Sequence, residues 1–123
     1  MKGIFEKVKE HAGDIDFAVQ PELLSLLSSG DFGRYANAQG DMNVCFISNN
    51  DITGGNSGSA MFNAKGELLG LAFDGNWEAM SSDILYEPKM QRTIGVDVRY
   101  ILFMIEKYGK AGNLIQELKL ANP

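Results

Sequence analysis

Residues 53–60, with the sequence TGGNSGSA, constrain this chain more than any other stretch, because three glycines and two serines stand within eight residues. Gly55 and Gly58 permit backbone angles that a side chain would forbid. A backbone bent in this way can aim the N–H groups of Gly55 and Ser57 at one point, where they would stabilise the oxyanion of an acyl-transfer reaction. The same composition is typical of a plain turn between two strands, so the stretch alone supports both interpretations.

The residues around this stretch predict β-strands. Residues 61–62 and 68–73 are apolar and are joined by the turn sequence NAKG, which is typical of a hairpin. Residues 43–48 combine β-branched and aromatic side chains, which favours a buried strand. Residues 94–96 predict one more short strand, and residues 74–92, which have no clear period, predict a long surface loop. We therefore expect the serine-containing stretch to lead into a hairpin.

Helices are predicted toward both ends of the chain. Residues 1–20 carry mixed charge around a few apolar positions, which predicts a short amphipathic helix or a trailing arm. A leucine-rich stretch that begins at Pro21 predicts a helix, and Gly30 should end it. Near the C-terminus, apolar residues at helical spacing predict a helix with Asp97 as its cap, and residues 111–120 predict a second one.

Length and charge narrow the class of protein. A chain of 123 residues holds one domain at most, with room for a single core. Eleven basic and sixteen acidic residues give a net charge of −5, which argues against a nucleic-acid partner. No apolar run approaches the roughly 20 residues that a membrane-spanning helix needs, so we expect no span.

The single cysteine and the single histidine are weak candidates for chemistry. Cys45 excludes an internal disulfide, and its apolar neighbours predict a buried thiol rather than a reactive one. His11 is the only internal candidate for a general base, but its charged surroundings favour a solvated residue. The acidic residues Asp83, Glu87 and Asp97 do not repeat at ligand spacing, so we expect no metal and no cofactor.

Several separated stretches carry a resemblance to a known family. Residues 54–59 (GGNSGS), 69–78 (LGLAFDGNWE) and 96–103 (VDVRYILF) are similar to the C-terminal part of bacterial serine dipeptidyl-peptidases of the 7 and 11 type. Residues 3–7 and 31–36 also resemble that family. The resemblance covers most of the chain, and its motifs lie far apart in the sequence, so it is specific.

The resemblance implies a fold and a setting for the chain. It implies an α+β fold, an incomplete chymotrypsin-like C-terminal β-barrel lobe with helices at the N- and C-terminal ends. Residues 1–123 would be a single domain, the serine-bearing C-terminal portion of a larger peptidase. Family members are exported, whereas no signal peptide opens this chain, so we expect a piece of a longer periplasmic or secreted enzyme. Ala60 stands where the family usually has proline, which we expect to alter loop stiffness more than chemistry.

The resemblance also assigns roles to individual residues. It places the nucleophile at Ser57 rather than at its rival Ser59, with the Gly55 backbone in the oxyanion hole. Asp74 would hold the free α-ammonium group of the substrate, since a carboxylate offers that group a charge-assisted hydrogen bond. Gly75 stands where members that prefer acidic side chains before the scissile bond have arginine, which implies a preference for hydrophobic side chains. The alternative interpretation is structural: Asp74 would be a capping or turn aspartate, and Gly75 the turn glycine that follows it.

Three functional hypotheses follow. The first is part of a serine dipeptidyl-peptidase that releases dipeptides from free N-termini, with the remaining N-terminal part of the enzyme as its partner. The resemblance implies that this N-terminal part supplies the histidine and aspartate of the catalytic triad, so we expect the isolated chain to be inactive. The second is a noncatalytic binding module that self-associates, as a homo-oligomer, through exposed apolar surface. The third is a stand-alone hydrolase with His11 as the base, while Arg34 could either pair with an acid or touch substrate.

Overall fold

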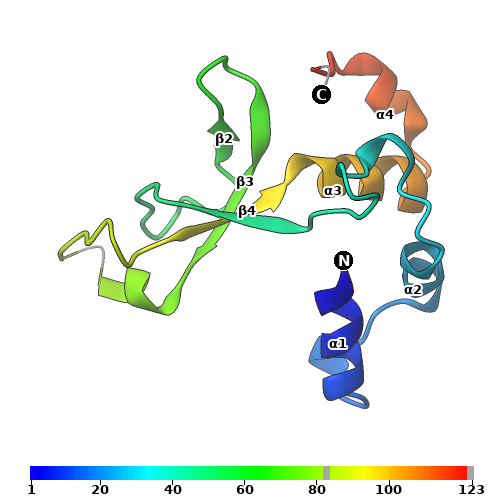
Figure 1. The fold of residues 1–123 in the computed structure, drawn as a ribbon, viewed down its shortest axis with the longest axis horizontal. Coiled ribbons are helices and arrows are strands. Elements are labelled where there is room, and N and C mark those ends of the chain that lie inside the picture. The colour runs from blue at the N-terminus through cyan, green and yellow to red at the C-terminus, as the bar shows by residue number, and fades with distance from the viewer. Residues whose placement is uncertain (82–83, 122–123) are drawn as a thin grey trace. The chain divides into compact units, whose positions relative to one another are not determined.

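The computed structural model describes residues 1–81 and 84–121, which form two compact units. Met1–Asn43 and Leu102–Leu118 form the first, called here the helical unit, and Val44–Ile101 with residues 119–121 form the second, called the sheet unit. Helices predominate in one unit and strands in the other (Figure 1), which confirms the predicted α+β class. That residues 1–123 make a single domain stays a prediction.

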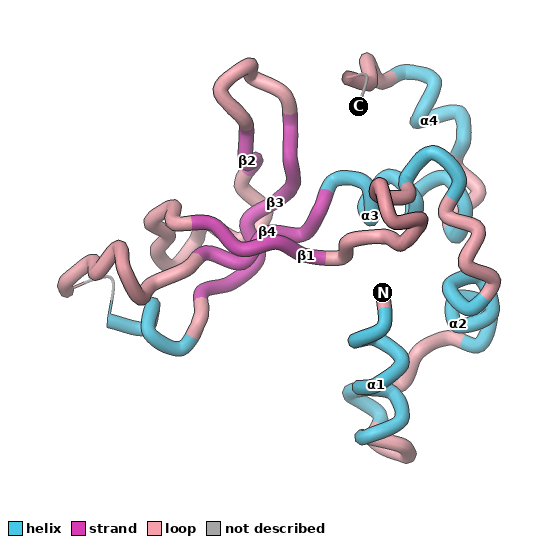
Figure 2. Tube along the Cα trace, viewed as in Figure 1, coloured by secondary structure: helices cyan, strands magenta, loops and turns pink. Residues whose placement is uncertain are grey.

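The sheet unit is built on four antiparallel strands in the order β1-β4-β3-β2 (Figure 2). The strands are β1 (Cys45–Ser48), β2 (Ala60–Phe62), β3 (Leu68–Gly75) and β4 (Thr93–Asp97). The predicted hairpin and the strands on either side of it are confirmed, and each begins and ends within two residues of the expected positions. The described strands form one open sheet, so the β-barrel lobe stays a prediction.

Two glycines allow the middle of this sheet to pack closely. A Cβ atom on Gly70 would lie 2.0 Å from the carbonyl oxygen of Val96. A Cβ atom on Gly95 would lie 2.7 Å from Met61 Sδ and 2.7 Å from the Phe46 ring. The aromatic ring and the thioether therefore lie against bare backbone, which fixes how β1 and β2 cover the two central strands.

A β-bulge interrupts the pairing of β3 with β4. Ala72 pairs with Gly95 and Asp74 pairs with Ile94, so Phe73 is an extra residue on β3. A regular strand would place residues 72 and 74 on one face of the sheet. Because Gly95 and Ile94 are neighbours on β4, the bulge turns Asp74 to the face opposite the buried Ala72. The bulge thus exposes this carboxylate.

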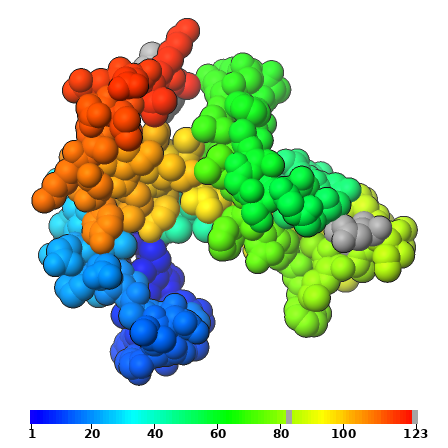
Figure 3. Space-filling view, turned by 180° about the vertical axis from the view of Figure 1, so that it is seen from behind, coloured from blue at the N-terminus to red at the C-terminus, as the bar shows by residue number. Residues whose placement is uncertain are grey.

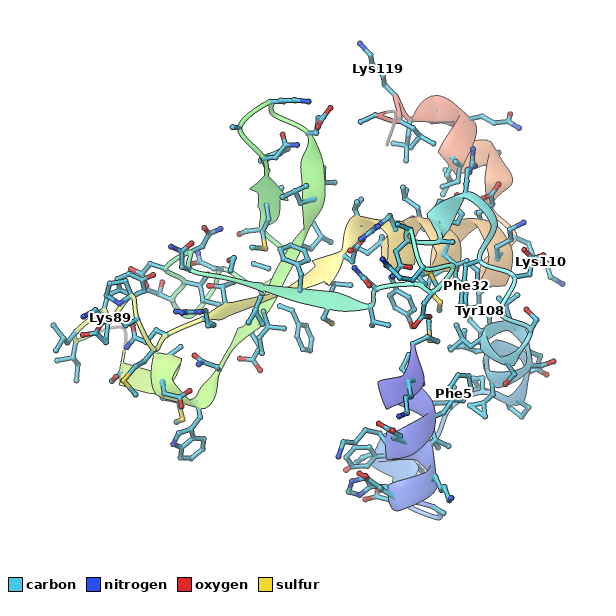
Figure 4. The ribbon with its side chains drawn as sticks, viewed as in Figure 1. Phe5, Phe32, Lys89, Tyr108, Lys110 and Lys119 are labelled. Atoms are coloured by element: carbon cyan, nitrogen blue, oxygen red, sulfur yellow. The ribbon has the colours of Figure 1, made fainter. Side chains whose placement is uncertain are left out.

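The prediction of a long surface loop over residues 74–92 is wrong in part. β3 continues to Gly75, and the 3₁₀-helix η3 (Trp77–Ser81) follows it. Gln91 is only 2% exposed and its side chain bonds to Ser81, Leu85 and Glu87, so part of this segment is buried. In the space-filling view the hairpin of β2 and β3 and the described residues 76–81 and 84–92 form separate projections of the sheet unit (Figure 3), and Lys89 lies near the outer end of the latter (Figure 4).

The helical unit contains most of the helices. They are α1 (Lys2–Glu10), η1 (Ile15–Phe17), α2 (Pro21–Ser28), η2 (Gly33–Tyr35), the end of α3 (Val98–Phe103), the π-helix η4 (Met104–Tyr108) and α4 (Gly112–Glu117). The predicted helices near both ends are confirmed, and the last is shorter than expected. In the described part of the chain, no helix has the length and apolar character to cross a bilayer.

An aromatic cluster holds the helical unit together. Phe103 is completely buried, and the rings of Phe32 and Tyr35 meet it edge-on with centroids 5.9 and 6.2 Å away. The Tyr35 hydroxyl donates to the carboxylate of Glu106, and Arg34 Nη2 donates to the same carboxylate over 3.0 Å. Arg34 therefore pairs with an acid, which was one of the two roles open to it.

The start of α3 is capped as predicted. Asp97 Oδ1 accepts from the backbone N–H of Arg99 over 2.9 Å, and both carboxylate oxygens also accept from the Arg99 guanidinium. The predicted burial of Cys45 is wrong, because it lies exposed at the start of edge strand β1. Partial burial of its sulfur, together with the Asp97 carboxylate, raises the pKa of the thiol above its ordinary value of 9.0. The thiol therefore stays protonated at neutral pH, which agrees with an unreactive cysteine.

Candidate active site

Ser57 lies at the corner of a glycine-closed turn. The N–H of Ser59 donates to the carbonyl of Asn56 over 3.0 Å, and Gly58 has a φ of +86°. A type II turn needs a positive φ at its third residue, where glycine carries no steric cost. Ser57 is the second residue of this turn, and its side chain is exposed. The local sequence therefore presents the hydroxyl to solvent at a bend that only glycine accommodates easily.

A second turn of the same kind precedes it. The N–H of Asn56 donates to the carbonyl of Thr53 over 3.2 Å, and Gly55 has a φ of +93°. The Asn56 side chain completes this turn by accepting from the N–H of Thr53 over 2.9 Å. Among the described residues, the N–H groups of Gly55 and Ser57 have no hydrogen-bond acceptor. Two donors beside the hydroxyl thus remain available to a ligand.

The loop that these turns form, residues 51–59, is called here the serine loop, and β3 holds its C-terminal end. The N–H of Gly58 donates to the carbonyl of Ala72 over 2.7 Å, and the N–H of Ala72 donates to the carbonyl of Ser59 over 2.8 Å. A left-handed glycine with this pair of bonds forms a G1 bulge. The nucleophile candidate is thereby fixed to the strand that also carries Asp74.

Asp74 and Gly75 lie at the far end of β3, beyond the Phe73 bulge. The Asp74 side chain is exposed, and its Oδ1 accepts from the N–H of Gly75 over 2.8 Å. Among the described residues, Oδ2 has no partner, so it remains free to accept from a cation. A Cβ atom on Gly75 would lie 2.8 Å from Ala79 Cβ, so the close packing against Ala79 is a structural reason for glycine at this position.

A cleft of about 260 Å³ opens beside the serine loop. Ser59 lines it, whereas Ser57 and Asp74 do not. Its full lining is Asn50, Asp51, Ile52, Asn56, Ser59, Ala60, Met61, Ala72 and Thr93. The cleft is therefore lined by residues 50–52, which lead into the serine loop, by Asn56 and Ser59 of that loop, and by residues of β2, β3 and β4.

The remaining sequence candidates take no part in this arrangement. His11 stacks on Phe17 with ring centroids 3.9 Å apart, within the helical unit. Among the described residues no three acidic, histidine or cysteine side chains gather as a metal site needs, and Asp83 lies outside them. The site therefore consists of the serine loop and the end of β3.

The chain belongs to the Peptidase S46 family, whose profile matches residues 1–120. It is 62% identical over 120 residues to the Dipeptidyl-peptidase 7 of Porphyromonas endodontalis, covering 97% of this chain and 14% of that protein. It is 48% identical to the Asp/Glu-specific dipeptidyl-peptidase of Capnocytophaga gingivalis, covering 98% of this chain and 17% of that protein. The chain thus spans about one sixth of the curated relatives that it matches.

Solved structures agree with the fold. The crystal structure of Porphyromonas endodontalis DPP11 in complex with the dipeptide Arg-Asp superposes with a TM-score of 0.90 at 44% identity, covering 97% of this chain and 17% of that one. The complex of the same protein with the dipeptide Arg-Glu gives a TM-score of 0.89 and covers 95% and 16%. The resemblance to dipeptidyl-peptidases noted from the sequence is therefore confirmed.

Proposed function

We propose that this chain is the serine-bearing C-terminal part of a dipeptidyl-peptidase that releases dipeptides from the free N-termini of peptides. The observation that carries the proposal is the exposed Ser57 in the second of two consecutive glycine-closed turns, beside the N–H groups of Gly55 and Ser57, which have no acceptor among the described residues. A serine hydroxyl attacks a carbonyl only when a base removes its proton. The larger peptidase supplies the histidine and aspartate of the triad, and it acts in the periplasm or is secreted.

The reaction that this geometry serves is acyl transfer. Ser57 Oγ forms a bond to the carbonyl carbon between the second and third residues of the peptide, and its proton passes to the base. The N–H groups of Gly55 and Ser57 donate to the resulting oxyanion, at about 2.7–4 kcal/mol for each donor. The C–N bond then breaks, the amine leaves with the proton, and water hydrolyses the dipeptidyl ester on Ser57.

Asp74 supports the choice of a dipeptidyl-peptidase. Its exposed carboxylate has an oxygen without a partner among the described residues. A carboxylate fixed at the end of a strand can bind the α-ammonium group of a peptide and so count residues from its N-terminus. Removal of this charge should raise KM for dipeptidyl substrates far more than it affects the reactivity of Ser57.

Gly75 supports a hydrophobic residue before the scissile bond, because glycine brings no positive charge to an acidic side chain. The relatives include enzymes named as Asp/Glu-specific, so the specificity needs its own test. In Gly75→Arg the new side chain would also collide with Ala79. The double variant Gly75→Arg with Ala79→Gly relieves that contact. Higher kcat/KM for acidic substrates in the double variant supports the proposal, and an unchanged preference contradicts it.

The test of the main proposal uses a chimera in which residues 1–120 replace the matching segment of the Porphyromonas endodontalis dipeptidyl-peptidase 7. The chimera should hydrolyse chromogenic dipeptidyl substrates, and Ser57→Ala should lower kcat by about four to six orders of magnitude. Ser59→Ala is the matched control and should keep most of the activity. Full loss of turnover in Ser59→Ala with activity in Ser57→Ala would contradict the assignment. Turnover by the isolated 123-residue chain would contradict its predicted inactivity.

A second candidate function is a self-associating module, and exposed apolar side chains in the sheet unit favour it. They include Ile47, Phe73, Trp77, Ile84 and Leu85, each more than half exposed. Exposed apolar surface of this kind marks sites that bind protein. Sedimentation of the chain tests this function, since a homo-oligomer that forms at micromolar concentration supports it and a monomer at every concentration excludes it.

A further inference from the structure

We propose that the hydroxyls of Tyr86 and Thr93 are positioning groups that fix the entry to the serine loop. They do so by donating to two consecutive backbone carbonyls, those of Asn49 and Asn50. The inference rests on the proposed function, since it concerns how Ser57 is placed relative to the substrate. The four residues are called here the hydroxyl clamp.

The contacts of Thr93 are the stronger half of the clamp. Thr93 is 1% exposed, and its Oγ1 donates to the Asn50 carbonyl over 2.6 Å. Tyr86 lies seven positions earlier in the chain, and its hydroxyl donates to the Asn49 carbonyl. A buried hydroxyl bonded to one backbone carbonyl costs free energy when its partner moves, so the bond holds the carbonyl in place.

The two ends of the serine loop are held in different ways. Backbone bonds to Ala72 hold its C-terminal end. At the other end, the β1–β4 ladder stops at the pair Ser48 and Thr93. Beyond that pair, the carbonyls of Asn49 and Asn50 bond to side-chain hydroxyls instead of to a strand. The path from Ser48 into the serine loop therefore depends on side chains that only tertiary contact supplies.

The same clamp is tied to the substrate-binding end of β3. Thr93 pairs with Gly75 across the sheet. Next to this pair, the N–H of Asn76 donates to the Arg92 carbonyl over 2.9 Å, and Asn76 Oδ1 accepts from the Arg92 N–H over 2.8 Å. These bonds extend the pairing of β3 with β4 by one residue pair.

Gln91, two residues before Thr93, holds the backbone on both sides of Tyr86 through its side-chain amide. Its Oε1 accepts from the N–H of Glu87 over 2.9 Å, and its Nε2 donates to the carbonyl of Leu85 over 3.1 Å. The bonds therefore lie on both sides of Tyr86. The bonds to Ala72 place the C-terminal end of the serine loop relative to Asp74 and Gly75, and the clamp places its N-terminal end. The clamp also borders the cleft through Asn50 and Thr93.

The experiment compares variants in the chimera described above. Thr93→Val keeps the shape of the side chain and removes the hydroxyl, whereas Thr93→Ser keeps the hydroxyl. Because a displacement of about 1 Å costs up to 100-fold in rate, we expect Thr93→Val to lower kcat about 10-fold or more, with KM changed less than 3-fold. Thr93→Ser should restore kcat to within 3-fold of the parent. Tyr86→Phe should give a smaller loss, with Tyr108→Phe as its matched control.

Titration with a fluorophosphonate separates positioning from stability, since kcat is then expressed per reactive serine. If Thr93→Val lowers only the reactive fraction and leaves kcat per titrated serine unchanged, Thr93 is structural and the inference is wrong. Equal kcat losses in Thr93→Ser and Thr93→Val also overturn it, because the hydroxyl would then not matter.

Failure of the proposed function gives a different pattern. If the chimera shows no turnover that depends on Ser57, the peptidase proposal fails, and amide hydrogen exchange in the chain decides on the clamp. The bonded N–H groups of Asn56 and Ser59 should then exchange at least 10-fold faster in Thr93→Val than in Thr93→Ser. Equal exchange in the two variants overturns the clamp.

Discussion

The helical unit and the sheet unit are stabilised in different ways. In the part of the chain that the structure describes, six of the eight buried hydrophobic residues belong to the helical unit, and the three buried polar residues belong to the sheet unit. In the helical unit, the rings of Phe32 and Tyr35 pack edge-on against the buried ring of Phe103. The buried polar residues, Gln91, Thr93 and Asp97, bond to the backbone of neighbouring segments.

Because of this difference, we expect the two units to be destabilised by different kinds of substitution. A core of apolar side chains responds to lost volume, since each removed methylene costs transfer free energy and leaves a cavity. A unit organised by hydrogen bonds and close backbone contacts responds to lost partners and to added atoms. The proposed active site lies wholly in the sheet unit, where geometry depends on directional bonds.

Phe103→Ala should have the largest effect on stability. The side chain is fully buried against Phe32 and Tyr35, so its removal should lower the free energy of unfolding by about 3–5 kcal/mol. Phe73→Ala in the sheet unit is the matched control, because that ring is 59% exposed. Urea unfolding of the 123-residue chain measures both, and equal losses would contradict the contrast between the units.

Gly70→Ala should be the most damaging single added methyl group in the sheet unit. Its Cβ would lie 2.0 Å from a backbone oxygen of β4, which cannot move without the strand, so we expect a loss of about 3 kcal/mol. Gly95→Ala meets the ends of Met61 and Phe46 instead, and these side chains can shift. Thermal unfolding should therefore rank Gly70→Ala below Gly95→Ala in stability. The reverse order would show that the backbone of β4 moves more easily than the side chains of Met61 and Phe46.

Gln91→Leu keeps the volume of a buried side chain and removes its hydrogen bonds. The N–H of Glu87 and the carbonyl of Leu85 would lose their partners, which should cost about 1–3 kcal/mol. Urea unfolding of the chain measures this loss. A neutral result would mean that the 76–92 segment is held by apolar contact, as the helical unit is.

Glu106→Gln should have the smallest effect, and the effect should depend on pH. The Tyr35 hydroxyl, and then Arg34, hold the pKa of Glu106 below its ordinary value of 4.5. The ionised carboxylate therefore stabilises the folded state above that pH, and this contribution disappears as pH falls through the lowered pKa. Melting temperatures of the two proteins should differ most near pH 7 and converge as the pH falls below 4.5 and through the lowered pKa of Glu106. A constant difference over that range would contradict the linkage.

Local signals in the sequence predicted much of the fold. The turn sequence after Phe62, Pro21 at a helix start and Asp97 as a cap each act over a few residues, and each is confirmed. The burial of Cys45 was predicted wrongly, because burial on an edge strand depends on what covers that edge. The interior of residues 76–92 was missed, since Gln91 gives no apolar signal.

The sequence by itself determined the two glycine-closed turns that expose Ser57, because positive φ values at Gly55 and Gly58 are a local property of residues without a Cβ atom. Only the tertiary structure decided which strand receives that loop and which face of the sheet carries Asp74. Those outcomes depend on the pairing register, on the bulge at Phe73 and on hydroxyl bonds between residues about 40 positions apart. Such contacts form only after distant segments meet, so no short stretch of the chain encodes them.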